Sequence, residues 1–272
     1  MTDGQTPENT IATRPPSHVE TPSITRGIEK VWGSDPEYQR IIPLETDIAT
    51  AVIEDMLAGR LSKEEAIRAI AVRSAESKVA SGFDGTTGLN NRTRLEERLH
   101  NLVGNSRRGG SKLTIAFADI DNFKLINDTL THDGGDSVLN AWGGHILSGL
   151  RRETDFGGRY GGEEAVLVFP NTGENWVTDF MEGLRREMPS TVGEAAMEMG
   201  YDLTNPATMS IGIAELRADS TDTRPDDVMM KELIKIADGR MYLAKENGRN
   251  QTVDSRNEEH VRRQIELGKT NG

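Results

Sequence analysis

The sequence contains no cysteine, which excludes disulfide bonds, thiolate metal sites and cysteine nucleophiles. Its five histidines are scattered and show no spacing typical of zinc ligands. No apolar run approaches the roughly 18–20 residues that a membrane-spanning helix needs, and the N-terminal residues lack the apolar core of a signal peptide. We therefore expect a soluble, cytoplasmic protein with no membrane partner.

Positive charge is also scarce, because 32 lysines and arginines stand against 44 aspartates and glutamates, giving a net charge of −12. This excess of negative charge argues against a nucleic-acid polymer or an anionic membrane as the main partner. A mononucleotide is still compatible, since metal ions and a few local cations can neutralise a triphosphate. The length of 272 residues allows one sizeable domain with an appendage, or two small domains.

Composition and periodicity divide the chain into four parts. The first is rich in Thr, Pro and Ser and is predicted to be disordered, whereas the second has apolar residues at helical spacing. In that second part Gly59 is a suitable helix end, and Ser62 with Glu65 forms a capping box that opens another helix. The four parts are a disordered tail over 1–40, a helical regulatory or dimerisation segment over 41–82, a main domain over 83–254 and a polar tail over 255–272.

Strands alternate with helices in the main domain, around one central hairpin. This order predicts an α+β fold, an α/β sandwich in which helices flank a mostly antiparallel sheet. The expected helices cover 94–102, 123–129, 136–150, 173–188 and 226–247, and the expected strands cover 113–118, the two arms of the hairpin up to Phe169, and 208–214. A loose helix is expected after residue 254.

The hairpin carries the most informative residues of the chain. Residues 159–169 read Arg-Tyr-Gly-Gly-Glu-Glu-Ala-Val-Leu-Val-Phe, which places Glu163 and Glu164 at the tip of a tight turn. Another acidic strand end, Asp119-Ile-Asp121, lies upstream. Strands that end in carboxylates converge on a divalent cation, because without one their charges would repel. The pattern predicts a magnesium site built for phosphates; the alternative is an ordinary Gly-Gly hairpin turn with a solvated acidic edge.

A second motif, Asp119-Ile-Asp121-Asn-Phe123-Lys124-Leu-Ile-Asn127-Asp128, is followed by His132-Asp-Gly-Gly135-Asp136. With the hairpin, a turn over 84–92 and a last segment over 237–250, these residues make the chain resemble the GGDEF family, the diguanylate cyclases. The resemblance runs from about residue 84 to 250 and implies a palm-like nucleotidyl-cyclase domain. It also implies GTP as substrate, cyclic di-GMP as product and at least a transient homodimer, because symmetric chemistry needs two facing domains.

The resemblance implies that Asp119, Ile120, Glu163 and Glu164 bind Mg²⁺, with Mn²⁺ as a substitute. Ile120 can contribute only its main-chain oxygen. Asp119 and the two glutamates are also the expected catalytic residues, and Glu163 is the candidate for removing the proton of the attacking 3′-hydroxyl. The chemistry agrees, since Mg²⁺ prefers hard oxygen ligands and keeps coordination places for phosphate.

The resemblance assigns guanine recognition to Asn127 and Asp136. A carboxylate can accept both neighbouring donors of guanine, a pair that adenine lacks; Asp136 also suits an N-terminal helix cap. Lys245 and Arg249 are expected to neutralise the β- and γ-phosphates, although cations near a helix C-terminus often only complement its dipole. The remaining expected substrate-binding residues are Lys124, His132, Gly161 and Gly162.

Arg152-Glu-Thr-Asp155 precedes the Gly-Gly turn at the spacing of the family's inhibitory product site. A guanidinium there can bind a phosphate or a guanine edge of the product, whereas the alternative is a surface Arg–Asp pair. Two further segments are interpreted as structural, the turn over 84–92 and a core strand around Gly212 whose glycine allows close packing.

The chain departs from the family pattern at three positions. Ala165 stands where the family has Phe, Thr131 replaces the Gly usually found before the histidine, and Thr86 replaces a Leu. None of these changes removes a charged site residue, so we favour an active cyclase. The alternative is a catalytically degenerate domain that acts as a receptor for GTP or cyclic di-GMP.

Overall fold

The computed structural model describes residues 82–201, 203, 205–216 and 221–270, together with Asp55, Gly59, Arg60, Ser62 and Glu65. The predicted tail over 1–40 and most of the predicted helical segment lie outside the described residues. Among the described helices, none is both long enough and apolar enough to pass through a lipid bilayer.

The sheet has five strands in the order β2-β3-β1-β4-β5. All neighbouring pairs are antiparallel except β4 and β5, which run parallel. The predicted α+β class with a mostly antiparallel sheet is therefore confirmed. The elements are α4 (Arg92–Gly109), β1 (Leu113–Ile120), α5 (Phe123–Gly149), β2 (Phe156–Gly161), β3 (Glu164–Pro170), α6 (Glu174–Glu198), β4 (Met209–Glu215), α7 (Asp226–Glu246), β5 (Thr252–Val253) and α8 (Glu258–Thr270).

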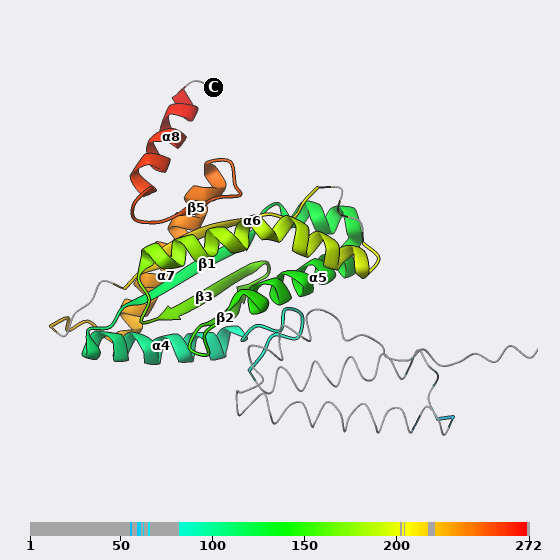
Figure 1. Ribbon diagram of the computed structural model, residues 1–272, viewed down its shortest axis with the longest axis horizontal. Coiled ribbons are helices and arrows are strands. Elements are labelled where there is room, and N and C mark those ends of the chain that lie inside the picture. The colour runs from blue at the N-terminus through cyan, green and yellow to red at the C-terminus, as the bar shows by residue number, and fades with distance from the viewer. Residues whose placement is uncertain are drawn as a thin grey trace, which may run out of the picture.

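Helices cover both faces of this sheet (Figure 1): α4 packs with α7, and α5 packs with α6. The central strand β1 is buried at every position, as expected for a strand covered on both sides. Where α7 crosses β4, a Cβ on Gly212 would lie 2.0 Å from the main-chain oxygen of Ala237. The expectation that this glycine permits close packing is confirmed.

Two helices are longer than predicted. α4 begins beyond the N-cap Asn91, whose side chain accepts from the amide of Arg94, and runs on to a left-handed cap at Gly110. α6 continues through Pro189 to Glu198. The buried side chains of Met188 and Val192 extend its apolar face past the proline, so packing outweighs the hydrogen bond that proline cannot make.

The two helices predicted over 123–129 and 136–150 are the halves of α5. They are separated by Thr131, whose φ of 69° and ψ of 175° are not helical. This backbone region is costly for a β-branched residue and is adopted almost only by glycine. The family's glycine at this position therefore has a conformational reason, and Thr131 holds the same kink with strain.

The few described residues of the helical segment bear out two local predictions. The amide of Arg60 donates to the carbonyl of Asp55 at 2.9 Å, and Gly59 has a φ of 71°, which is a helix C-terminal motif. The capping box is also present, because the Ser62 amide donates to Glu65 at 2.8 Å and the Glu65 amide donates to the Ser62 hydroxyl at 3.3 Å.

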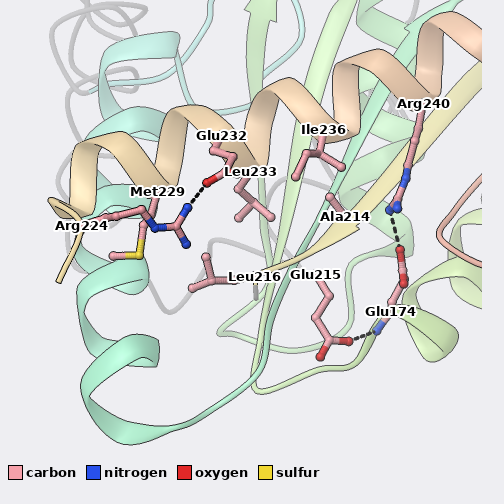
Figure 2. A pocket seen from close by; sticks show the side chains of 10 residues that line it. All are labelled: Glu174, Ala214, Glu215, Leu216, Arg224, Met229, Glu232, Leu233, Ile236 and Arg240. Atoms are coloured by element: carbon pink, nitrogen blue, oxygen red, sulfur yellow. Dashed lines mark hydrogen bonds and ion pairs between the residues drawn. The ribbon is translucent and has the colours of Figure 1, made fainter. Parts of the chain in front are cut away.

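The C-terminal helix α8 stands away from the sheet (Figure 1) and is tied to it by a buried arginine. Arg240 of α7 donates to Glu174 and to Glu258, both at 2.8 Å. The pair with Glu174 lies at one end of a pocket of about 240 Å³ between β4 and α7 (Figure 2), and a pair between Arg224 and Glu232 lies at the other. The carboxylates of Glu174 and Glu258 together neutralise the guanidinium of Arg240, so we assign this arginine a structural role.

Candidate active site

The pairing of β1 with β3 brings the predicted acidic residues together. Asp119 and Glu164 are direct partners in the register of the two strands. One residue further on, the amide of Ile120 donates to the carbonyl of Glu163 at 3.3 Å. Because side chains of directly opposed residues lie on the same face of a sheet, Asp119 and Glu164 share one face at the end of the hairpin.

Asp119 is a buried carboxylate, only 3% exposed. Its Oδ2 lies 2.7 Å from the ammonium of Lys245, whereas its Oδ1 is buried without a hydrogen-bond partner. Burial is the main cause that raises the pKa of Asp119 to about 6, and Lys245 opposes the rise. The carboxylate therefore has one oxygen available for a further positive ligand.

Glu164 lies at the edge of a cavity of about 460 Å³ formed by α4, β2 and α7. Partial burial raises the pKa of Glu164, and the charge of Asp238 adds to the rise. A Cβ on Gly161 would lie 2.7 Å from an oxygen of this carboxylate. Neither glycine of the turn has a positive φ, so Gly161 is needed for space rather than for an unusual backbone conformation.

These oxygens are suitable for a hard cation. Among the described residues, no three acidic or histidine side chains already converge on one point. Two carboxylates with a main-chain oxygen are nevertheless a sufficient protein contribution for Mg²⁺, which usually keeps several places for water and phosphate. The unpartnered oxygen of Asp119 is the observation in favour of this fit.

Arg159 holds the Gly-Gly turn in place. Its Nε donates to the carbonyl of Gly162 at 2.8 Å, and its Nη1 lies 3.1 Å from both oxygens of Asp84. Asp84 also accepts from the amide and the hydroxyl of Thr87, each at 2.8 Å. The turn at the start of the domain is therefore structural, as predicted, and it is joined to the acidic hairpin through one guanidinium.

Asp121 has a role that sequence reasoning missed. Its carboxylate accepts from the hydroxyls of Thr208 at 2.7 Å and Ser210 at 2.6 Å, and from the amide of Asn250 at 3.0 Å. These bonds fix the end of β1 against β4 and against the loop that carries Arg249. The Asp-Ile-Asp spacing was the available signal, because residues two apart in an extended segment point to the same face.

The predicted guanine-reading residues lie on the two halves of α5. The amide of Asn127 packs so closely on Gly135 that a Cβ there would lie 1.7 Å from Oδ1. Asp136, the next residue, is exposed, as are Lys124 and His132. The alternative of Asp136 as a helix cap is wrong, because the second half of α5 already begins directly after the Thr131 kink.

Arg249 and the Arg152–Asp155 motif occupy two different places in the fold. Arg249 is exposed in the turn after α7, with a φ of 66°. Arg152 and Asp155 precede β2, at the opposite end of that strand from the Gly-Gly turn. Asp155 is only 3% exposed, and burial raises its pKa. The expected product site is therefore separate from the expected catalytic site.

Ala165 is fully buried and keeps its register with Ala118 and Arg159. The hairpin is thus closed without the phenylalanine that the family has at this position. Thr86, the third departure, lies in the first turn of the domain, where its carbonyl accepts from the side chain of Asn140 at 2.9 Å. A main-chain contact of this kind does not depend on the side chain at residue 86.

Comparison with known proteins gives the same family as the motifs. The family model "Diguanylate cyclase, GGDEF domain" matches residues 81–251. The response regulator PleD of Caulobacter vibrioides is 36% identical over 173 residues, covering 62% of this chain and 35% of PleD. The probable diguanylate cyclase DgcC of Escherichia coli is 33% identical over 215 residues, covering 77% of this chain and 53% of DgcC. The chain thus spans about a third to a half of these curated relatives.

Solved structures agree with the fold. The GGDEF domain of DgcB from Caulobacter crescentus, in complex with c-di-GMP, matches with a TM-score of 0.55 and 27% identity over 64% of this chain and 96% of that one. The active GGEEF domain of a diguanylate cyclase from Vibrio cholerae matches with a TM-score of 0.52 and 27% identity over 61% and 97% of the two chains. With a family model that covers most of its described residues, this chain belongs to the GGDEF family of diguanylate cyclase domains.

Proposed function

We propose that the protein condenses two GTP molecules into cyclic di-GMP and releases two pyrophosphates. The observation that carries this proposal is the β1–β3 register, which sets Asp119 opposite Glu164 beside Glu163, with Lys245 against them. The family membership of the chain supports the same conclusion.

Asp119, Glu163 and the main-chain oxygen of Ile120 would hold Mg²⁺, with Glu164 as a supporting ligand. The bound cation would polarise the α-phosphorus and favour ionisation of the attacking 3′-hydroxyl. Glu163 is half-exposed in the turn, so it can reach a substrate oxygen and accept the hydroxyl proton. Arg159 keeps this turn in position through the carbonyl of Gly162.

The other site residues would bind the nucleotide. Asp136 and Asn127 would accept and donate at the guanine edge, which favours GTP over ATP. Lys245 and Arg249 would neutralise the β- and γ-phosphates. Because Lys245 now pairs with Asp119, a cation on Asp119 would release the ammonium for the phosphates. The remaining motif residues, Lys124, His132, Gly161 and Gly162, would line the same nucleotide site.

Each domain would bind one GTP, and the two domains of a homodimer would face each other so that each 3′-hydroxyl attacks the other α-phosphorus. The segment over 41–82 is our candidate for controlling that dimer. Arg152 and Asp155 would bind the product and inhibit turnover, since they lie at the far end of β2 from the reacting groups.

The test is an assay of purified protein with GTP and Mg²⁺, with the product identified by mass. Glu163→Gln and Glu164→Gln are expected to abolish turnover, whereas Glu198→Gln, an exposed glutamate at the far end of α6, is the matched control. Arg152→Ala is expected to raise the concentration of cyclic di-GMP needed for inhibition. No cyclic di-GMP at any protein concentration would contradict the proposal.

A second candidate is a non-catalytic receptor for GTP or cyclic di-GMP. Ala165 in the signature and the strained Thr131 favour it, because both depart from the family pattern near the site. Calorimetry that shows nucleotide binding by protein without turnover would select this function over the first.

A further inference from the structure

Trp176 is a rigid aromatic side chain with one part open to solvent. It lies in the first turns of α6 and is 44% exposed. Its indole stacks on Phe180 with centroids 5.3 Å apart and planes 6° apart, and Phe169 meets both rings edge-on. The ring is therefore fixed by its neighbours, although nearly half of its surface lies outside the core.

The guanidinium of Arg152 rests on this indole. Its Cζ lies 4.5 Å from the ring centroid, and its Nη1 donates to the hydroxyl of Thr172 at 3.0 Å. Both contacts are modest, since an exposed cation–π pair contributes little and the hydroxyl is neutral. Arg152 can therefore leave the ring for a stronger acceptor.

A pocket of about 400 Å³ opens beside this pair and is lined by Asp155, Asp179 and Gly183 as well as by both aromatic rings of α6. Asp155 is almost fully buried, and within the part of the chain that the structure describes its carboxylate accepts a single, long side-chain hydrogen bond of 3.4 Å from Thr154. A Cβ on Gly183 would meet nothing within 4 Å, so this wall of the pocket has free space.

A flat ring, a guanidinium and a carboxylate match the three parts of a guanine base. The face of the base stacks on an aromatic ring, its O6 and N7 accept from a guanidinium, and its N1–H and amino group donate to a carboxylate. We propose that Trp176 is a base-stacking residue of the product site, on which a guanine of the cyclic dinucleotide takes the place of Arg152. The identity of the ligand rests on the proposed function; the stacking role of Trp176 does not.

Tryptophan fluorescence tests this proposal without any turnover. The chain has three tryptophans; Trp142 is fully buried, and Trp32 lies outside the described residues. Cyclic di-GMP is expected to quench the wild-type protein saturably, and Trp176→Phe is expected to lose that quenching. Cyclic di-AMP is the ligand control, because adenine lacks the donor pair that Asp155 would accept.

Inhibition gives a second measurement. Trp176→Leu is expected to raise the concentration of cyclic di-GMP for half-inhibition by about tenfold, the usual size of one lost base–aromatic stack. The inhibited rate of each variant is divided by the rate of the same variant without added product. Met197→Leu is the matched control, because Met197 is another exposed apolar residue of α6. Trp176→Phe keeps an aromatic ring in the Phe180 stack and should give a smaller rise.

The outcomes separate this inference from the proposed function. Quenching of the wild type alone, in protein that makes no cyclic di-GMP, would support the stacking role and refute the cyclase. Inhibition by cyclic di-GMP that is unchanged in Trp176→Leu, or binding measured by calorimetry without any quenching of Trp176, would overturn the inference and leave the cyclase intact. Absence of binding by calorimetry would overturn it as well.

Discussion

Lys245 places its ammonium 2.7 Å from Oδ2 of Asp119, the buried carboxylate at the end of β1. Replacing this lysine leaves a buried acid without its cation, so we expect Lys245→Met to lower the free energy of unfolding by roughly 2 kcal/mol in the absence of Mg²⁺, between the values for exposed and fully buried pairs. Thermal unfolding with and without Mg²⁺ measures this effect.

Mg²⁺ should stabilise Lys245→Met more than it stabilises the wild type, because the cation then meets an unpaired Asp119 instead of displacing a lysine. Lys112→Met is the control, since Lys112 is exposed and pairs with Glu215 at the opposite end of β1 from Asp119. If wild type and Lys245→Met are equally stable, or if Mg²⁺ stabilises both equally, then the ammonium of Lys245 does not compete with Mg²⁺ for Asp119.

Thr131 strains the backbone at the kink of α5. Glycine adopts a φ of 69° and a ψ of 175° readily, so Thr131→Gly should raise the free energy of unfolding by about 1 kcal/mol. Thr129→Gly is the control, because it places glycine in a regular helical turn and should lower stability by about 0.5 kcal/mol. Urea denaturation of both variants checks the sign; a loss of stability in Thr131→Gly would contradict the described backbone.

His145 makes stability depend on pH. It is buried, Nε2 lies 2.8 Å from the carbonyl oxygen of Leu184, and burial lowers its pKa. Below about pH 6.5 the unfolded chain binds a proton that the folded chain does not. The stabilising contribution is therefore complete above that pH and is lost as the pH falls. Urea denaturation over this range should show a shallower pH dependence for His145→Gln; identical slopes would exclude His145 as the cause.

Gly212 allows α7 to lie directly on β4. Gly212→Ala would push a methyl against the main chain at Ala237 and Met241, and we expect a loss of about 3 kcal/mol or more. Gly239→Ala on α7 meets open space and should gain up to about 1 kcal/mol from helix propensity. Chemical denaturation of the two variants measures both changes. An unchanged free energy of unfolding in Gly212→Ala would refute the close contact.

The sequence was sufficient for the fold class and for most elements, because the central strands are nearly continuous apolar runs and the second half of α5 and α7 have apolar residues at helical spacing. Prediction from the sequence failed for elements that have no regular spacing of apolar residues. β5 is only two residues long and is defined by its parallel pairing with β4. The C-terminal part of α4 is polar up to Gly109, and α6 passes a proline that usually ends a helix.

The acidic residues of the site were predictable because their motif is local. The hydrogen bonds that hold the site together were not predictable. Arg159 donates to Asp84 and the amide of Asn250 donates to Asp121 only because the tertiary fold brings these distant residues together. Trp176 was overlooked for the same reason, because a tryptophan on a helix usually packs in the core. Only its stacking against Arg152 makes it a candidate for binding.

The proposed cyclase reaction requires a divalent cation held by Asp119 and Glu163 beside a purine triphosphate. A crystal structure with a non-hydrolysable GTP analogue and Mn²⁺, in which anomalous scattering locates the metal, tests this most directly. We expect the metal at Oδ1 of Asp119 and the carboxylate of Glu163, with Lys245 moved from Asp119 to the phosphates. A bound analogue with no metal there, or with the two carboxylates pointing apart, would contradict the proposed cyclase reaction.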